Sequence, residues 1–227
     1  MYQPNSSQTV LLCGKIMGFE FEDYNQTLIN GDLLFKTGQK LGTVTCIKES
    51  THEFVALGHP AITKCSNTNI NGICHEIVID GIDKSYKNHI GHINGILKSN
   101  KQIGIVNKNN QFGIFGTIDE IKEDECIEIE TANRYETKLG TAELVIAFGN
   151  EKLQSYKIKV IAVNHMSDTK NIKIKIQDNK LIEKTGGILE GMSGAPIVQN
   201  GKLIGAINYA NPNKPDEAYA IFIDKLI

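Results

Sequence analysis

The chain of 227 residues contains 41% hydrophobic and 22% charged residues, and its mean hydropathy is −0.20. These proportions are typical of a globular protein whose core is large enough to fold without disulfides or metal ions. The 24 basic and 26 acidic residues nearly balance, and Arg134 is the only arginine. Both features exclude a nucleic-acid-binding protein that depends on a basic surface, so we expect no nucleic-acid partner.

No apolar run reaches the roughly 20 residues that span a bilayer, and the first residues lack the pattern of a signal peptide. The cysteines show no spacing typical of a zinc site. They are Cys13, Cys46, Cys65, Cys74 and Cys126. We therefore expect small buried thiols, with one disulfide as the alternative, and no metal or cofactor.

Short apolar or alternating runs, separated by Gly, Asn and Asp, predict strands along most of the chain. In chain order they are 44–47, 54–57, 76–79, 103–106, 127–130, 143–148, 155–163, 172–176, 195–198 and 203–209. Helical periodicity is scarce and predicts only two short helices, at 90–97 and 179–184. Many short strands of this kind favour an all-β sandwich or barrel.

Two of these segments carry particularly clear patterns. Residues 172–176 alternate isoleucine and lysine, as in a strand with one buried and one solvated face. Asn200–Gly201 lies between two apolar runs, and this dipeptide predicts a type I′ hairpin turn.

The segment 191–196, Gly-Met-Ser-Gly-Ala-Pro, is the one that indicates chemistry. Gly191 allows a sharp turn, so that its N–H group and that of Ser193 can point to one spot and hold an oxyanion. Gly194 and Pro196 leave room around the hydroxyl group. The alternative is a glycine-rich turn with an incidental serine, but the strand, Asn-Gly turn and strand that follow favour a nucleophile.

A serine nucleophile needs a base. His59 follows the apolar run 54–57 and lies between Gly58 and Pro60, at the exit of a predicted strand. The other histidines are His52, His75, His89, His92 and His165; we interpret His89 and His92 as surface residues. The order of histidine before serine is that of chymotrypsin and differs from that of α/β-hydrolases.

From about Lys40 to its C-terminus, the chain resembles the SpoIVB peptidase family of sporulating bacteria. The resemblance is carried by the stretches KLGTVT at 40–45, FVALGH at 54–59, QFGIFG at 111–116 and LIEKTGGILEGMSGAPIVQNGKLIGA at 181–206. It implies a serine endopeptidase with two six-stranded β-barrels, as in chymotrypsin, and an active site in the cleft between them. We expect an N-terminal barrel at 1–116 that carries the histidine and a C-terminal barrel at 117–227 that carries the serine.

The resemblance also implies site residues. The nucleophile falls on Ser193, the base on His59 and the acid of the triad on Asp178, 15 residues before the serine. Asp178 also stands just before a predicted helix, where Asp is favoured as an N-cap. By position, the alternative acids are Asp80, Asp83 and Asp119.

Substrate contacts can be predicted in the same way. Ile207, Asn208 and Tyr209 lie on the strand expected to pair with an extended substrate. Gly187, six residues before the nucleophile, offers no charge, so we expect no requirement for a basic residue at the cleaved bond.

The expected activity is cleavage of a protein substrate, the chain itself included, through an acyl-enzyme. Two alternatives remain open: a catalytically silent β-barrel that only binds partners, and an esterase that shares the nucleophile. Family members carry a membrane-targeting segment and a PDZ domain, which implies a membrane-associated full-length relative. The resemblance places the protein in the space between forespore and mother cell, whereas the absence of a targeting segment in this chain favours the cytoplasm or an excised domain.

Overall fold

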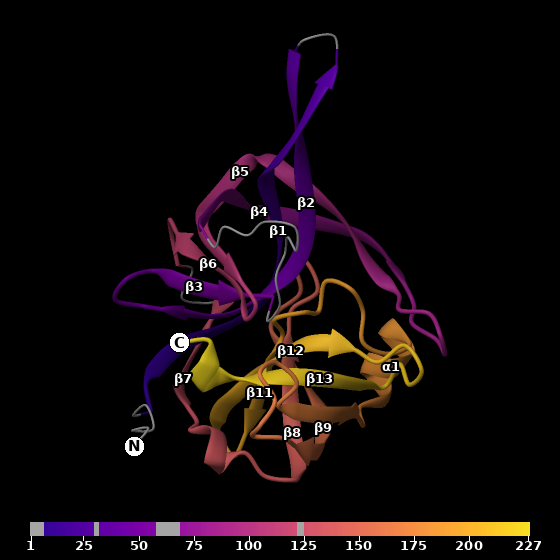
Figure 1. Ribbon diagram of the computed structural model, residues 1–227. Coiled ribbons are helices and arrows are strands. Elements are labelled where there is room, and N and C mark those ends of the chain that lie inside the picture. Colours follow the sequence, from indigo (N-terminus) through magenta and orange to yellow (C-terminus); the bar gives the residue numbers. More distant parts are fainter. Residues whose placement is uncertain (1–6, 30–31, 58–68, 122–124) are drawn as a thin grey trace.

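The computed structural model describes residues 7–29, 32–57, 69–121 and 125–227. It confirms the predicted all-β class, with 61% of residues in strands and 7% in helices (Figure 1). One large sheet contains all thirteen strands of the described residues, and its strand order closes on itself in two places.

The first ring consists of six strands from the N-terminal half. They are β1 (Thr9–Ile29), β2 (Asp32–Lys48), β3 (Glu53–Ala56), β4 (Asn69–Asp83), β5 (His92–Asn110) and β6 (Gly113–Ile118). The hydrogen-bonded order is β1–β2–β3–β6–β5–β4, and β4 pairs back to β1. Phe19, Phe21 and Phe54 are almost fully buried in the core associated with this ring.

A second ring of six strands comes from the C-terminal half. It contains β8 (Gly140–Ile146), β9 (Gln154–Val163), β10 (Ile172–Ile176), β11 (Pro196–Gln199), β12 (Lys202–Ala210) and β13 (Glu217–Phe222). The order is β11–β8–β9–β10–β13–β12, and β12 pairs back to β11. As predicted, Ile172, Ile174 and Ile176 are buried, because the isoleucines of β10 all face the core.

Strand β7 (Ile127–Thr131) joins the two rings. It pairs antiparallel with β1 and parallel with β12. A shared apolar cluster packs Val10 and Leu12 of β1 with Leu203 of β12 and Ile221 of β13. The two halves are therefore connected by both backbone pairing and side-chain burial (Figure 1).

Helical structure is limited to short segments of the described residues. They include α1 (Asn179–Thr185) and two 3-10 helices, η2 (Arg134–Glu136) and η3 (Ile223–Lys225). Helix α1 confirms the prediction at 179–184. The Asn200–Gly201 hairpin is confirmed too, since both residues have the positive φ of a type I′ turn, 52° and 75°.

The helix predicted at 90–97 is wrong, because most of this segment belongs to β5. Its apolar residues do have helical spacing, but the backbone pairs with β4, for example Ile93 with Ile82 and Gly95 with Ile79. Glycine at 95 is suited to this packing, since a Cβ there would lie 2.9 Å from Leu41 Cδ1.

No helix of the described residues is long and apolar enough to cross a membrane. Cys13, Cys46 and Cys74 are buried free thiols, as expected, whereas Cys126 is partly exposed. Burial raises the pKa of the Cys46 thiol to about 12. Cys65 lies outside the described residues.

Candidate active site

Ser193 lies in the loop between α1 and β11, and two glycines shape this loop. Gly191 and Gly194 have φ values of 101° and 94°, a conformation that side chains disfavour. At Gly194 a Cβ would also lie 2.0 Å from Thr43 O and 2.6 Å from Leu57 N. Glycine therefore allows the loop to approach the first ring closely at this position.

The carbonyl groups of the Ser193 loop are bound by strand β2. Thr43 Oγ1 donates to Gly191 O at 2.9 Å, and Thr43 N donates to Ser193 O at 2.8 Å. Thr45 Oγ1 donates to Gly194 O at 2.7 Å. Both threonines are fully buried. The first ring thus fixes how the peptide groups around Ser193 are oriented.

The other side of the loop is bound by strand β12. Gly194 N donates to Ile207 O at 2.7 Å, and Ile207 N donates to Ala195 O at 2.9 Å. Ser193 Oγ donates to Asn208 O at 3.4 Å. Of the residues predicted to contact substrate, Ile207 thus uses its backbone to hold the loop, and Asn208 lies beside the serine hydroxyl.

Asn208 is an extra residue in strand β12. Ile207 pairs with Ala220 and Tyr209 pairs with Tyr219, so Asn208 forms a bulge between these two pairs. Bulges of this kind are frequent next to active sites, because they redirect backbone groups. Its buried side chain donates from Nδ2 to Thr169 O at 2.8 Å, which ties the bulge to the loop 164–171.

His59 lies outside the described residues, which resume at residue 69. The described chain reaches Leu57, two residues earlier in the sequence. Leu57 N donates to Thr43 O at 3.3 Å, and its φ is 72°. The segment that leads to His59 is therefore held beside Gly194 and the Ser193 loop.

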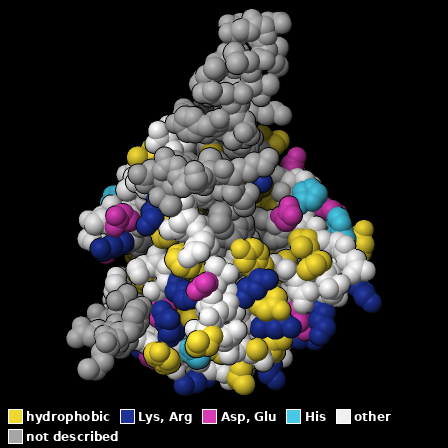
Figure 2. Space-filling model, in the orientation of Figure 1, with side chains coloured by type: hydrophobic (Ala, Val, Ile, Leu, Met, Phe, Trp, Pro, Cys, Tyr) yellow, Lys and Arg dark blue, Asp and Glu magenta, His cyan; other side chains and the backbone are white. Residues whose placement is uncertain are grey.

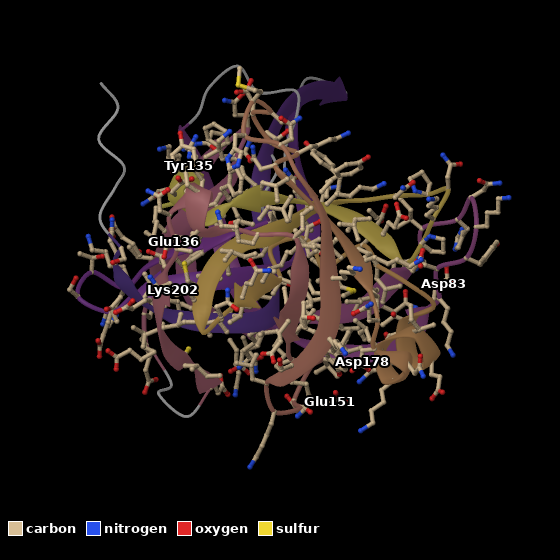
Figure 3. The ribbon with its side chains drawn as sticks, turned by 90° about the horizontal axis from the view of Figure 1, so that it is seen from below. Asp83, Tyr135, Glu136, Glu151, Asp178 and Lys202 are labelled. Atoms are coloured by element: carbon tan, nitrogen blue, oxygen red, sulfur yellow. The ribbon has the colours of Figure 1, made fainter. Side chains whose placement is uncertain are left out.

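Asp178 is the N-cap of α1, one of its two predicted roles. Its carboxylate accepts a hydrogen bond from Leu181 N at 3.1 Å. It lies close enough to Tyr156 to contribute, after burial and Glu151, to raising the pKa of that phenol. Figure 3 shows Asp178 and Glu151 at the end of the molecule that carries α1. Its role as the acid of a triad remains a prediction.

Asp83, one of the alternative acids, lies in a histidine cluster that sequence reasoning did not identify. Its Oδ2 is 2.8 Å from His89 Nε2 and 3.5 Å from His92 Nδ1. The backbone of this segment pairs with the Ser193 loop, since Ile93 N donates to Glu190 O at 3.1 Å. No sequence pattern marked this cluster, because β5 was predicted there as a helix.

The other predicted positions have distinct surroundings. Asp80 is exposed in β4, three residues before the strand ends. Asp119 follows β6, and its charge adds to burial in raising the pKa of Cys74. Gly187 packs against the segment before β13, where a Cβ would lie 2.3 Å from Pro215 O.

Sequence reasoning missed three threonines that contact the Ser193 loop or the bulge at Asn208, namely Thr43, Thr45 and Thr169. For Thr43 and Thr45, the only signal in the sequence was their place in the stretch KLGTVT.

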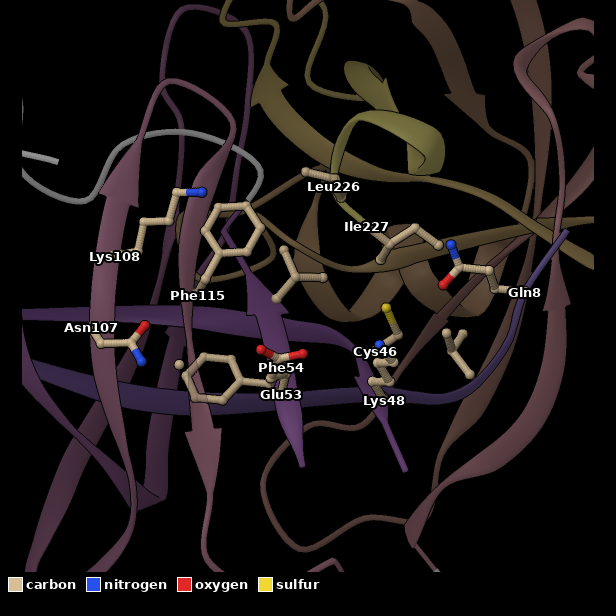
Figure 4. Close-up of a pocket in the computed structure, with 13 residues that line it drawn as sticks. Gln8, Cys46, Lys48, Glu53, Phe54, Asn107, Lys108, Phe115, Leu226 and Ile227 are labelled. Carbon is tan, nitrogen blue, oxygen red and sulfur yellow. The ribbon is translucent and has the colours of Figure 1, made fainter. Parts of the chain in front are cut away.

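A cavity of about 440 Å³ lies elsewhere, between the first ring and the C-terminus (Figure 4). Phe54, Phe115 and Cys46 line it together with Leu226 and Ile227. None of its lining residues belongs to the Ser193 loop. Within the described residues, no cluster of three or more histidine, cysteine or carboxylate side chains could hold a metal ion.

Comparison with known proteins supports the resemblance found in the sequence. A family model described as SpoIVB peptidase S55 matches residues 33–227. No curated protein sequence matches the chain. The matched range covers most of the chain and includes Thr43 and Thr45 of β2, the Ser193 loop and β12, whose hydrogen bonds build the site. The chain therefore belongs to the SpoIVB peptidase family.

Proposed function

We propose that this peptidase is a serine endopeptidase that cleaves protein substrates through an acyl-enzyme formed on Ser193. The observation that carries the proposal is the double attachment of the Ser193 loop. Its carbonyls are bound by Thr43 and Thr45, and its hydroxyl group is directed to Asn208 O. A loop bound on both sides holds a nucleophile in a fixed position, which catalysis requires.

The same attachment supports the predicted oxyanion hole. Gly191 O accepts from Thr43 and Met192 N donates to Leu189 O at 3.2 Å, so the peptide between the two predicted donors is fixed. The peptides that carry the donors are held as well, because Ile93 N donates to Glu190 O at 3.1 Å and Ala195 N donates to Met192 O at 2.9 Å. We assign the N–H groups of Gly191 and Ser193 to the oxyanion. Donors that are oriented before the reaction contribute about 2.7–4 kcal/mol each to stabilising such an intermediate.

In the proposed reaction, Ser193 Oγ bonds to the substrate carbonyl carbon while its proton passes to His59. His59 then donates this proton to the leaving amine as the C–N bond breaks, and water hydrolyses the acyl-enzyme by the reverse order of steps. The position of Leu57 supports this assignment, since two Cα–Cα steps span at most about 7.6 Å.

The other five histidines have contacts of their own. His165 stacks on Tyr135 and Phe222, and His52 Nδ1 lies 3.3 Å from Ile118 O. His89 and His92 face Asp83, and His75 Nε2 lies 3.4 Å from Glu20. Family membership and the position of Leu57 favour His59 as the base. Family membership alone supports Asp178 as the acid that orients it.

We extend the proposal to the fold. The two closed rings of six strands support two β-barrels of the chymotrypsin type, with the catalytic serine between them. The predicted division at 116/117 falls within β6, so we propose that the boundary between the two barrels lies after Ile118. Family membership implies export to the space between forespore and mother cell and cleavage of a membrane-associated regulator in sporulation. Protein substrates also follow from it, and the chain itself can be one of them.

A fluorophosphonate probe tests the nucleophile directly. We expect one adduct on Ser193, located by mass spectrometry of peptides, and none in the Ser193→Ala variant. A folded wild-type protein that stays unlabelled would contradict the proposal and favour a catalytically silent binding module. Hydrolysis of a small ester without cleavage of any peptide, the chain itself included, would instead identify an esterase.

A further inference from the structure

An aromatic and basic cluster lies next to the Ser193 site. Tyr209 follows Asn208 in β12 and pairs across the sheet with Tyr219 of β13. Lys170 Nζ lies 5.2 Å from the ring centre of Tyr209 and 5.1 Å from that of Tyr219. Figure 2 shows basic and hydrophobic side chains together over the region where Figure 1 places β12 and β13. We call these three residues the Lys170 cluster.

The loop that carries Lys170 is attached directly to the bulge beside Ser193. Asn208 presents its carbonyl to Ser193 Oγ and its Nδ2 to Thr169 O, the neighbour of Lys170. Two residues, Asn208 and Thr169, therefore connect the serine hydroxyl to Lys170. An extended substrate that lies along β12 from Ser193 would pass this cluster within a few residues, since a strand rises about 3.3 Å per residue.

Further hydrogen bonds make the loop rigid. Lys170 N donates to Ser167 Oγ at 2.9 Å, and Lys225 Nζ donates to Ser167 O and Asp168 O at 2.8 and 2.7 Å. Asn171 Nδ2 also donates to Ser167 O. A subsite on such a loop loses little conformational entropy when it binds substrate.

Lys170 differs from the other lysines of this surface in having no acidic partner among the described residues. Lys173 and Lys214 both pair with Glu217, and Lys175 pairs with Asp216. Among the described residues, no carboxylate forms an ion pair with Lys170, whose ammonium group lies over the two rings named above. An exposed ammonium group between two aromatic faces is suited to a carboxylate whose aliphatic part packs on the rings.

We propose that the Lys170 cluster is a specificity subsite for an acidic side chain of the protein substrate, within four residues of the cleaved bond. This inference rests on the proposed function of Ser193. Lys170 would pair with the substrate carboxylate, and Tyr209 and Tyr219 would contact its methylene groups.

The test is a digest of a proteome-derived peptide mixture, with the cleaved bonds read by mass spectrometry. For the wild-type protein we expect Asp and Glu to be enriched at one position within four residues of the cleaved bond. Lys170→Met should abolish the enrichment, and Lys170→Glu should replace it with Lys and Arg. For a peptide with Glu at that position, kcat/KM should fall about tenfold or more in Lys170→Met, the size of a lost contact to a charged group.

Lys175→Met is the matched control, because it removes a lysine of the same surface that already has an acidic partner. It should keep the preference of the wild-type protein. Cleavage without acidic enrichment, or an enrichment that survives in both Lys170 variants, would overturn the subsite alone. If the wild-type protein cleaves no peptide and Ser193 takes up no fluorophosphonate, the proposed function fails and the subsite with it.

Discussion

Thr43 Oγ1 donates to Gly191 O at 2.9 Å, so a side chain of the first ring orients the peptide group that lies between the two N–H donors of the predicted oxyanion hole. The Thr43 side chain is fully buried, and its hydrogen-bond acceptor lies 148 residues later in the sequence. Its effect on catalysis would be indirect, because it positions the peptide that joins the two donors and does not contact the substrate.

Thr43→Val should weaken catalysis and stability together. The variant has nearly the same shape but leaves Gly191 O without its donor, which costs about 1–3 kcal/mol in the free energy of unfolding. We expect kcat to fall by about ten- to a hundredfold, less than the loss of an oxyanion donor itself, with little change in KM. Steady-state kinetics and urea unfolding measure the two effects. Thr43→Ser keeps the hydroxyl group and should retain most of the activity; equal losses in both variants would contradict the argument.

Gly194→Ala should destabilise the protein far more than Gly201→Ala. Both glycines have positive φ, which costs an alanine about 1–2 kcal/mol. Only at Gly194 would the new Cβ also meet backbone atoms, at 2.0 and 2.6 Å, whereas nothing lies within 4 Å at Gly201. Urea unfolding of both variants isolates the steric contribution. Equal losses of stability would show that the loop can move away from β2.

Asp178→Asn separates the two roles of Asp178. Asparagine caps helices as well as aspartate does, so stability should stay within about 0.5 kcal/mol of wild type. The acid role implied by the family requires turnover to fall by about four orders of magnitude, because the imidazole would adopt the wrong tautomer. Asp178→Ala, in contrast, should also lower stability by about 1 kcal/mol. Full turnover in the Asn variant would restrict Asp178 to capping α1.

Glu217 should contribute to the loss of stability in acid. Its hydrogen bond with Lys173 lowers its pKa, burial opposes this, and Lys214 adds to the lowering. The folded pKa is thus below the unfolded value of about 4.3. The stabilisation is fully present above that value and is lost as the pH falls through the folded pKa. Urea unfolding can be measured from pH 6 to pH 3, a range that includes the unfolded pKa of about 4.3. Over this range the free energy of unfolding should fall less for Glu217→Gln than for wild type. Parallel curves would exclude this residue as a source of acid sensitivity.

The sequence predicts strands well where one face of the strand is buried. Tyr156, Ile158 and Val160 alternate with exposed residues and were assigned correctly. Strand β1 was not predicted, although it has 21 residues. It pairs with β2 and β4 of the first ring and with β7 at the junction, and a strand with several neighbours shows no simple alternation.

The site was predictable only in part, for a similar reason. A glycine pattern and a strand context predict Ser193 as the nucleophile, because local geometry constrains those residue types. Thr43, Thr45 and Thr169 act through contacts with residues distant in sequence, and a threonine within a strand carries no sign of its partner. Asp83 was noted as a candidate acid, but its pairing with His89 and His92 depends on how β4 and β5 align.

The attachment of the Ser193 loop to β2 also concerns how the enzyme is assembled. A fragment that contains only the second ring would hold the serine, both loop glycines and β12, but it would lack the donors of Thr43 and Thr45. Such a fragment would be a latent enzyme, and docking of the first ring onto it would be the step that activates it.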